Sequence, residues 1–95
     1  MDLSAAVNEM RILQFTYRGF PRTVEPHAFG IDGNGHPALL AFQTAGGSES
    51  GKIVGWKLFH VNEILNYIDT GDSFIGPRAD YNGPGKGFST VTAKL

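Results

Sequence analysis

A short polar turn between two β-type segments constrains the fold of this chain more than any other part of its sequence. Residues 22–31 and 37–44 form the two segments, and Asp32-Gly33-Asn34-Gly35 joins them. Glycines and short polar side chains tolerate the positive φ angles that a tight hairpin requires. The sequence therefore predicts an antiparallel β-hairpin over residues 22–44.

Pro26 lies inside the first strand of this hairpin. Proline has no N–H group to donate to a neighbouring strand, so it is confined to sheet edges, bulges and bends. We therefore expect the strand to be strongly curved at this position.

The segments on either side of the hairpin also follow regular patterns. One helix face is predicted near the N-terminus by apolar residues at helical spacing: Leu3, Ala6, Val7 and Met10. From Arg11 the period changes to two, which predicts a strand that continues through residue 17. Residues 52–60 predict a central strand because both of its faces are partly apolar, and residues 64–68 predict a short fifth strand.

One helix followed by five short strands is typical of a small SH3-like or Sm-like barrel. We therefore predict a mainly β fold in which residues 1–70 form a five-stranded barrel with a short N-terminal helix. The second and third strands, joined by the tight turn, are its longest expected elements.

The C-terminal part of the chain has a different composition. Residues 71–87 are rich in glycine and proline, which predicts an extended arm laid over the barrel or reaching a neighbouring molecule. Residues 88–95 contain enough β-branched side chains to add an edge strand, within the chain or in trans. We treat residues 71–95 as part of the same domain, and we expect four apolar anchors in them: Phe74, Ile75, Tyr81 and Phe88.

Composition limits the classes of protein to which the chain can belong. With 95 residues, of which 41% are hydrophobic and 18% charged, it fits one soluble globular domain. A net charge of -1 excludes the long-range field of general DNA-binding proteins but leaves room for a local basic patch. No cysteine is present for a disulfide or a thiolate site. Because we find neither a signal peptide nor a long apolar run, we expect a cytoplasmic, bacterial-type protein with no membrane partner.

Several stretches together resemble the WYL domain. They are Leu13-x-Phe15-x-Tyr17, Arg22-Thr23-Val24-Glu25-Pro26, Leu39-Leu40-Ala41-Phe42, and Lys57-Leu58-Phe59 leading to Ile64. The resemblance covers roughly residues 5–68, and its most distinctive part is the Arg-x-Val-Glu-Pro element after an aromatic strand. It implies an Sm-like β-barrel of the kind attached to bacterial transcription regulators or defence proteins. It also implies a basic and aromatic patch that senses a ligand or nucleic acid.

The chain departs from the family pattern at identifiable positions. Pro37, Ala38 and Leu39 stand where the family has its Trp-Tyr-Leu residues. Lys57 replaces the first downstream arginine, which keeps the charge but not the planar fork of a guanidinium group. Glu63 stands where a second arginine would precede the isoleucine, and no helix-turn-helix is present. We therefore expect a divergent, stand-alone module of WYL-like type.

Five residues in or near these elements are our candidates for a ligand-binding or nucleic-acid-binding site: Arg22, His27, Gln43, Trp56 and Lys57. Cationic and aromatic side chains together can hold a small anionic ligand or single-stranded nucleic acid without a metal. We therefore expect a non-enzymatic regulatory module that needs no cofactor. The alternative is that Trp56 packs in the core, while the arginines are solvated or pair with Glu25 and Glu63.

Neither a metal site nor a catalytic site is predicted. No two of His27, His36 and His60 have the spacing typical of metal ligands, and no cysteine completes a set. Ser48 and Ser50 lie in a glycine-rich loop without the Gly-Lys-Ser/Thr sequence of a phosphate-binding loop. We expect no catalytic residues and no bound metal.

A second hypothesis gives the chain a role in assembly. Residues 71–95 could pair with an exposed sheet edge of another subunit, either a second copy or a partner protein. On this hypothesis the glycine- and proline-rich arm is an interaction element, and the chain is a protein-interaction module.

Overall fold

The structure is a computed structural model that describes all residues from 1 to 95. Its elements in chain order are helix α1 (Leu3–Asn8) and strands β1 (Arg11–Tyr17), β2 (Phe20–Asp32), β3 (Pro37–Gly46) and β4 (Gly55–His60), the 3₁₀ turn η1 (Val61–Glu63), strand β5 (Ile64–Ser73), the 3₁₀ turn η2 (Gly85–Gly87) and strand β6 (Phe88–Lys94). The chain is therefore a mainly β domain of six strands with one short helix near its N-terminus.

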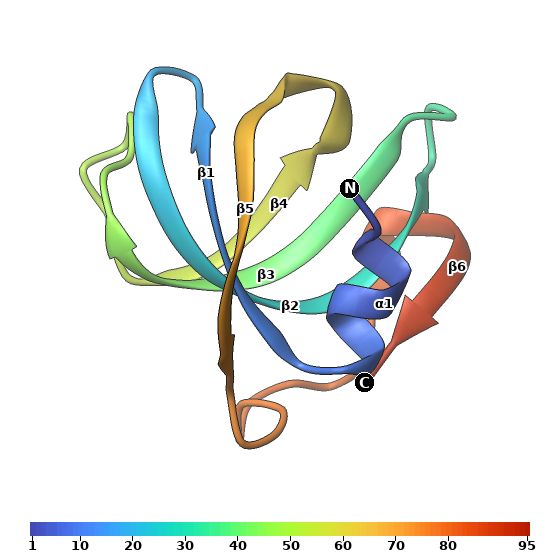
Figure 1. Ribbon diagram of the computed structural model, residues 1–95. Coiled ribbons are helices and arrows are strands. Elements are labelled where there is room, and N and C mark those ends of the chain that lie inside the picture. The colour runs from blue at the N-terminus through green and yellow to red at the C-terminus, as the bar shows by residue number, and fades with distance from the viewer.

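All strand pairs are antiparallel, and five strands follow the order β4-β3-β2-β1-β5, with β6 paired to β2 (Figure 1). Strands β4 and β5 form the two ends of this order and are not paired with each other, although η1 connects them directly. Helix α1 packs against β2 and β6. It has six residues, too few for any helical passage through a lipid bilayer.

Strand β2 organises the sheet because it pairs with three other strands. Its first part pairs with β1, its last part pairs with β6, and β3 runs along its other edge. The pairing with β3 shifts register between Pro26 and Ala28, so that His27 is an extra residue in a β-bulge. This bulge confirms the irregularity expected from Pro26. Farther along, a Cβ atom at Gly30 would collide with the carbonyl oxygen of Thr90, so only glycine fits where β6 approaches.

The main hydrophobic core lies between α1 and the inner faces of the strands. It includes Leu3 and Val7 from the helix, and Leu13 and Phe15 from β1. The ring of Phe59 meets Phe15 edge to face at 5.0 Å and Tyr17 at 4.9 Å between centroids. Phe59 therefore packs the C-terminal end of β4 against β1.

The predicted hairpin is confirmed, with Ile31 opposite Pro37 and Arg22 opposite Gly46. The predicted helix is confirmed over Leu3–Asn8, but Met10 lies beyond its end with a positive φ of 54°. The prediction that residues 52–60 form a central strand is wrong. Strand β4 begins only at Gly55 and lies at one end of the sheet, because its outer edge has no partner.

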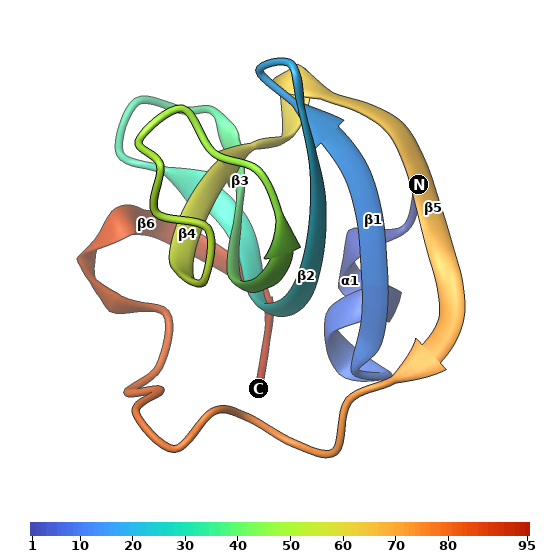
Figure 2. The same cartoon turned by 90° about the vertical axis from the view of Figure 1, so that its left-hand side faces the viewer.

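The C-terminal segment differs from the prediction in one way, because strand β5 continues to Ser73. The predicted edge strand over residues 88–95 is present as β6, and of the two pairings left open it makes the one within the chain, with β2. Between β5 and β6, residues 74–87 run across one side of the molecule (Figure 2). Among the expected anchors Phe74 is buried and Tyr81 half-buried, whereas Ile75 is fully exposed and anchors nothing.

Candidate functional site

The five candidate residues separate into two groups on different sides of the sheet. Arg22 and Lys57 line a pocket, and Gln43 contacts Arg22 directly behind it. His27 and Trp56 instead lie against residues 74–81. The reason is the strand geometry: Trp56 and Lys57 are consecutive in β4, and consecutive side chains of a strand point to opposite faces.

The pocket has a volume of about 330 Å³ and is lined by the β1–β2 turn, the loop of residues 47–54 and β4. Three cationic side chains line it, from Arg18, Arg22 and Lys57, and we call it the cationic pocket. Figures 1 and 2 both place the β1–β2 turn beside the 47–54 loop and away from the segment that joins β5 to β6.

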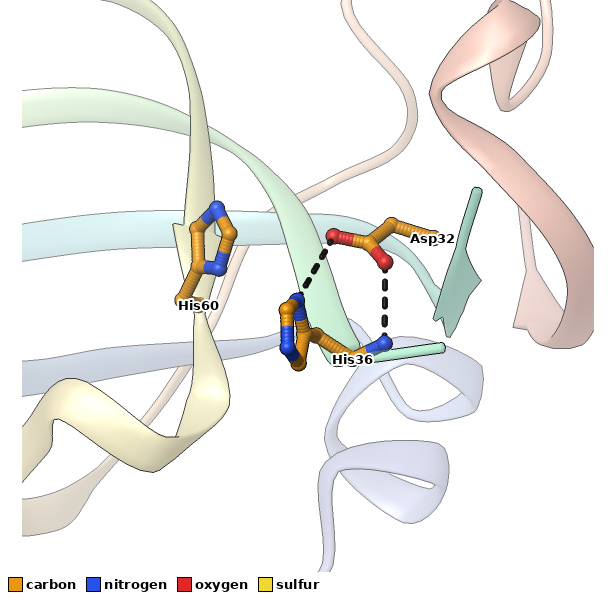
Figure 3. A group of neighbouring side chains, drawn as sticks. All are labelled: Asp32, His36 and His60. Atoms are coloured by element: carbon orange, nitrogen blue, oxygen red, sulfur yellow. Dashed lines mark hydrogen bonds and ion pairs between the residues drawn. The ribbon is translucent and has the colours of Figure 1, made fainter. Parts of the chain in front are cut away.

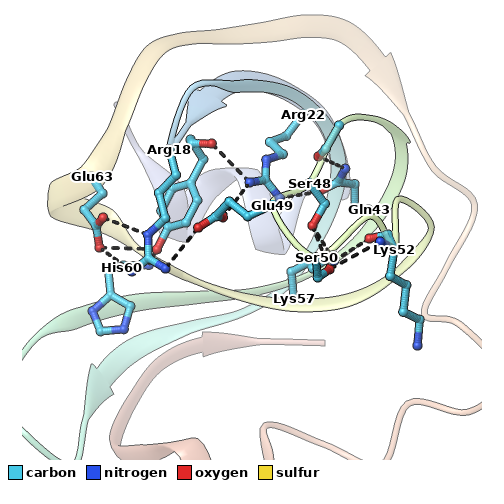
Figure 4. Close-up of polar contacts among 12 residues, drawn as sticks. Arg18, Arg22, Gln43, Ser48, Glu49, Ser50, Lys52, Lys57, His60 and Glu63 are labelled. Carbon is cyan, nitrogen blue, oxygen red and sulfur yellow. Dashed lines mark hydrogen bonds and ion pairs between the residues drawn. The ribbon is translucent and has the colours of Figure 1, made fainter.

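Arg22 is the buried centre of the cationic pocket, with 2% of its side chain exposed. Its Nη1 donates to Gln43 Oε1 at 3.2 Å, and its Nη2 donates to the Tyr17 carbonyl oxygen at 3.1 Å (Figure 4). Its Nε donates to no partner. The guanidinium carbon lies 5.5 Å from the ring centre of Tyr17 and 5.7 Å from that of Phe59. Two of the hydrogen bonds of this buried cation are thus accepted by neutral groups.

The only carboxylate that pairs with Arg22 belongs to Glu49, at 3.3 Å from Nη2. Glu49 lies on the glycine-rich 47–54 loop, and 49% of its side chain is exposed. It also faces Arg18 at 3.6 Å. The Glu49 carboxylate therefore sits between two guanidinium groups at the edge of the cationic pocket.

Polar contacts fold the loop over the cationic pocket. Lys57 Nζ donates to Ser48 Oγ at 3.2 Å and to the Lys52 carbonyl oxygen at 2.6 Å. Gln43, which is fully buried, donates to the Gly47 carbonyl oxygen at 2.9 Å. Gln43 thus links the loop to Arg22. It holds both in place but does not itself line the pocket.

Arg18 lies in the β1–β2 turn with a positive φ of 49°. It donates to Glu63 through Nε at 3.0 Å and through Nη2 at 3.2 Å. These hydrogen bonds lower the pKa of the Glu63 carboxyl and raise the pKa of the Arg18 guanidinium. Glu63 therefore compensates Arg18, while Arg22 pairs only with the half-exposed Glu49, and Lys57 forms no ion pair.

The second group surrounds His27, which the bulge in β2 places in a fully buried position. The backbone N–H of Arg78 donates to Nε2 at 3.1 Å, so the proton of the neutral ring is on Nδ1, which donates to the Glu25 carbonyl oxygen at 2.8 Å. Burial lowers the pKa of His27. Its ring stacks on Phe74 at 5.4 Å and meets Trp56 edge to face at 4.7 Å.

Trp56 and Arg78 complete this group, which we call the arm cluster: His27, Trp56, Phe74, Arg78 and Tyr81. Trp56 Nε1 donates to Asp80 Oδ2 at 3.0 Å. Arg78 forms two hydrogen bonds with Glu25, at 2.8 and 3.1 Å, and its guanidinium carbon lies 4.1 Å from the ring centre of Phe42. Trp56 is half-buried and lies outside the main core, and its ring packs against His27 of β2, Phe42 of β3 and Tyr81 of the arm.

Sequence reasoning missed the residues of both groups that come from distant or flexible segments. Arg18, Glu49 and Arg78 are not among the five candidates predicted from the sequence. The alternative pairing of arginines with Glu25 and Glu63 is found in the structure, through Arg78 and Arg18 respectively. No local pattern signals these pairs, because 53 and 45 positions separate the partners.

The fold and its contacts define a small mainly β domain with a cationic pocket on one side and a packed arm on the other. Comparison of the chain with family models, curated proteins and solved structures finds no match. The resemblance to the WYL domain therefore stays a prediction from the residues quoted above.

Proposed function

We propose that this domain is a non-enzymatic binding module of WYL-like type that holds an anionic group, as a small ligand or within single-stranded nucleic acid, in the cationic pocket. The observation that carries the proposal is the buried guanidinium of Arg22, which lines the pocket with its Nε unpartnered. Burying a charge is costly unless it is paired and hydrogen-bonded. A guanidinium fork matches the geometry of phosphate and carboxylate groups.

The position of Glu49 supports this proposal. Its carboxylate occupies the place beside Arg18 and Arg22 that an anionic ligand would take. Because Glu49 is half exposed and belongs to a glycine-rich loop, a ligand can displace it without disturbing a strand. The pocket volume of about 330 Å³ is at the lower end of the range found for small-molecule sites.

The finer fold assignment belongs to the same proposal. We infer that the sheet is a partly open barrel of Sm-like type. The assignment is supported by the curvature of β2, which leaves β1 and then pairs with β6. It is also supported by η1, which links the two end strands of the sheet within three residues.

A binding titration with matched variants tests the proposal. The probe is a fluorescently labelled oligothymidylate about ten nucleotides long, and inorganic phosphate and a mononucleotide serve as competitors. We expect binding that weakens with salt, is lost in Lys57→Glu and is strengthened in Glu49→Gln. Lys86→Glu makes the same charge change at an exposed site in η2 and should leave binding nearly unchanged.

Three outcomes would contradict the proposal. They are no binding at low ionic strength, equal losses in Lys57→Glu and Lys86→Glu, and unchanged binding in Glu49→Gln. Because Glu49→Gln alters only an exposed side chain, it remains informative if Lys57→Glu fails to fold. Circular dichroism of each variant checks its folding.

An assembly role is the second candidate, and exposed apolar side chains on β5 favour it. Leu65 is 60% and Ile68 55% exposed on this end strand, whose outer edge is unpaired. Light scattering on the full chain and on Ile68→Lys tests the idea. A larger mass for the full chain than for the variant supports self-assembly through β5. A monomeric mass for both rules out self-assembly through this surface. Truncation at Thr70 is unsuitable, because it would remove β6 from β2.

A further inference from the structure

The predicted turn and the end of β4 bring three potential metal ligands together, of which only His60 also lines the cationic pocket. Asp32 ends β2, His36 precedes β3, and His60 ends β4 opposite Ala38. One ligand atom from each of the three lies within 4.8 Å of the others (Figure 3). Sequence spacing gave no sign of this group, because 24 positions separate the two histidines and only the pairing of β3 with β4 brings them together.

The carboxylate of Asp32 is held in a fixed orientation by the turn. Its Oδ1 accepts the backbone N–H groups of Asn34 and His36, both at 2.9 Å. These hydrogen bonds lower the pKa of the Asp32 carboxyl, which favours the ionised form. Its Oδ2 lies 3.8 Å from His36 Nδ1, which is too long for a hydrogen bond, and is therefore available as a ligand.

The two imidazoles are also available. The His36 and His60 rings lie 5.9 Å apart, and neither ring forms a hydrogen bond with the protein. The side chain of His36 is 54% exposed, so its ring can turn without disturbing the core. Tetrahedral ligands at about 2.0–2.2 Å from a metal lie roughly 3.3–3.6 Å apart, so a modest rotation closes the site.

We propose that Asp32, His36 and His60 bind one divalent transition-metal cation through one carboxylate oxygen and two imidazole nitrogens. Two imidazoles and a carboxylate suit Zn²⁺, Ni²⁺ or Cu²⁺, whereas Mg²⁺ and Ca²⁺ prefer sites made entirely of oxygen ligands. Three protein ligands leave at least one coordination position for water. The simpler interpretation of Asp32 as a turn residue accounts for Oδ1, but it leaves Oδ2 and both imidazoles without a hydrogen bond, since the 3.8 Å contact of Oδ2 with His36 Nδ1 is an ion pair only when that ring is protonated.

The expected affinity is moderate. Metal-binding histidines usually donate their second N–H group to a carboxylate or carbonyl, and loss of that support weakens binding about 10–100-fold. Because His36 and His60 lack such partners, we expect a dissociation constant in the micromolar range. The site therefore takes up and releases its cation, and the fold does not depend on it.

Isothermal titration of the full, untagged chain with ZnCl₂ tests the proposal, with MgCl₂ as the comparison cation. We expect one saturable Zn²⁺ site, no Mg²⁺ binding, and a Zn²⁺ affinity at least tenfold lower in His36→Ala and His60→Ala. Asp32→Asn keeps an oxygen for the turn hydrogen bonds and should also weaken binding. Asp72→Asn, at an exposed acidic residue of β5, is the matched control and should bind like the unchanged chain.

Two results would overturn the proposal. One is no Zn²⁺ binding at about 100 μM free cation, far above the expected dissociation constant. The other is full binding in both histidine variants, which would place the metal elsewhere. His36→Ala changes an exposed ring, so circular dichroism should show an unchanged fold. This test uses only the metal as its probe, so it does not depend on the proposed anion binding.

Discussion

Two arginine–glutamate pairs, one on each side of the sheet, differ in which partner is buried. In the cationic pocket Arg22 is buried and its partner Glu49 is half exposed on a loop. Next to the arm cluster, Glu25 is largely buried and accepts two hydrogen bonds from Arg78, a member of that cluster. The second pair satisfies its buried charge, whereas the first leaves the Arg22 Nε without a partner. The difference is consistent with our proposal, in which an anionic ligand replaces Glu49 beside Arg22 while the Arg78–Glu25 pair stays intact.

The largest expected effect is a loss of stability when the arm cluster is disrupted at Trp56. Trp56→Ala removes the ring that packs against His27, Phe42 and Tyr81 and leaves Asp80 without its donor. We expect the free energy of unfolding in urea to fall by about 3 kcal/mol. The affinity for the anionic probe, measured at low temperature where the variant is folded, should stay unchanged. A loss of affinity in the folded variant would show that the two sides are coupled.

Glu25→Gln should have the next largest effect. It leaves the guanidinium of Arg78 without its charged partner, and charged hydrogen bonds of this kind contribute about 1.5–3 kcal/mol. We expect a loss of about 1–2 kcal/mol in urea unfolding, because glutamine keeps one acceptor. Glu9→Gln, at an exposed residue that forms no ion pair, is the control. Equal stability of the two variants would contradict the structural role given to the Arg78–Glu25 pair.

Lowering the pH should reduce the free energy of unfolding through His27 before the carboxylates are protonated. Burial lowers the pKa of His27, so the folded state favours the neutral ring. The resulting stability is present above the unfolded value of about 6.5 and is lost as the pH falls from there toward the folded pKa. Urea unfolding between pH 7.5 and 5 and NMR titration of the His27 ring measure this effect. A His27 titration midpoint at or above 6.5 would refute it.

The smallest expected effect on stability is at Glu49. Because this carboxylate is half exposed, Glu49→Gln should change the free energy of unfolding by less than about 1 kcal/mol. The same substitution should tighten binding of the anionic probe severalfold, because it removes a competing carboxylate from Arg22. A marked loss of stability with no gain in affinity would make the Arg22–Glu49 pair equivalent to the Arg78–Glu25 pair.

The elements that sequence reasoning predicted well depend on local patterns. The turn at Asp32–Gly35, the α1 helix and the irregularity at Pro26 follow from residue types a few positions apart. The central placement of β4 was wrong because an alternating apolar pattern describes two faces but says nothing about edge partners. The pairing of β6 with β2 in the same chain depends on a register that no short pattern encodes.

The candidate site was predicted as one surface, and the structure divides it. The alternation of β4 already places Trp56 and Lys57 on opposite faces, so this separation could have been predicted from the strand itself. The burial of His27 could not, because the bulge at Pro26 changes which residues point inward. Glu49 and Arg78 enter through long-range packing, for which the sequence offers no local signal.

The pairing of β6 with β2 also has a consequence for the order of folding. Residues 28–32 emerge from the ribosome long before residues 88–94, which fill one of their edges. Contacts between such distant segments carry a large loop-closure entropy and form late and slowly. Until β6 is in place, this part of β2 has a bare backbone edge, to which Gly30 adds no protecting side chain. This nascent stage, more than the finished domain, is where we expect the chain to be vulnerable to aggregation.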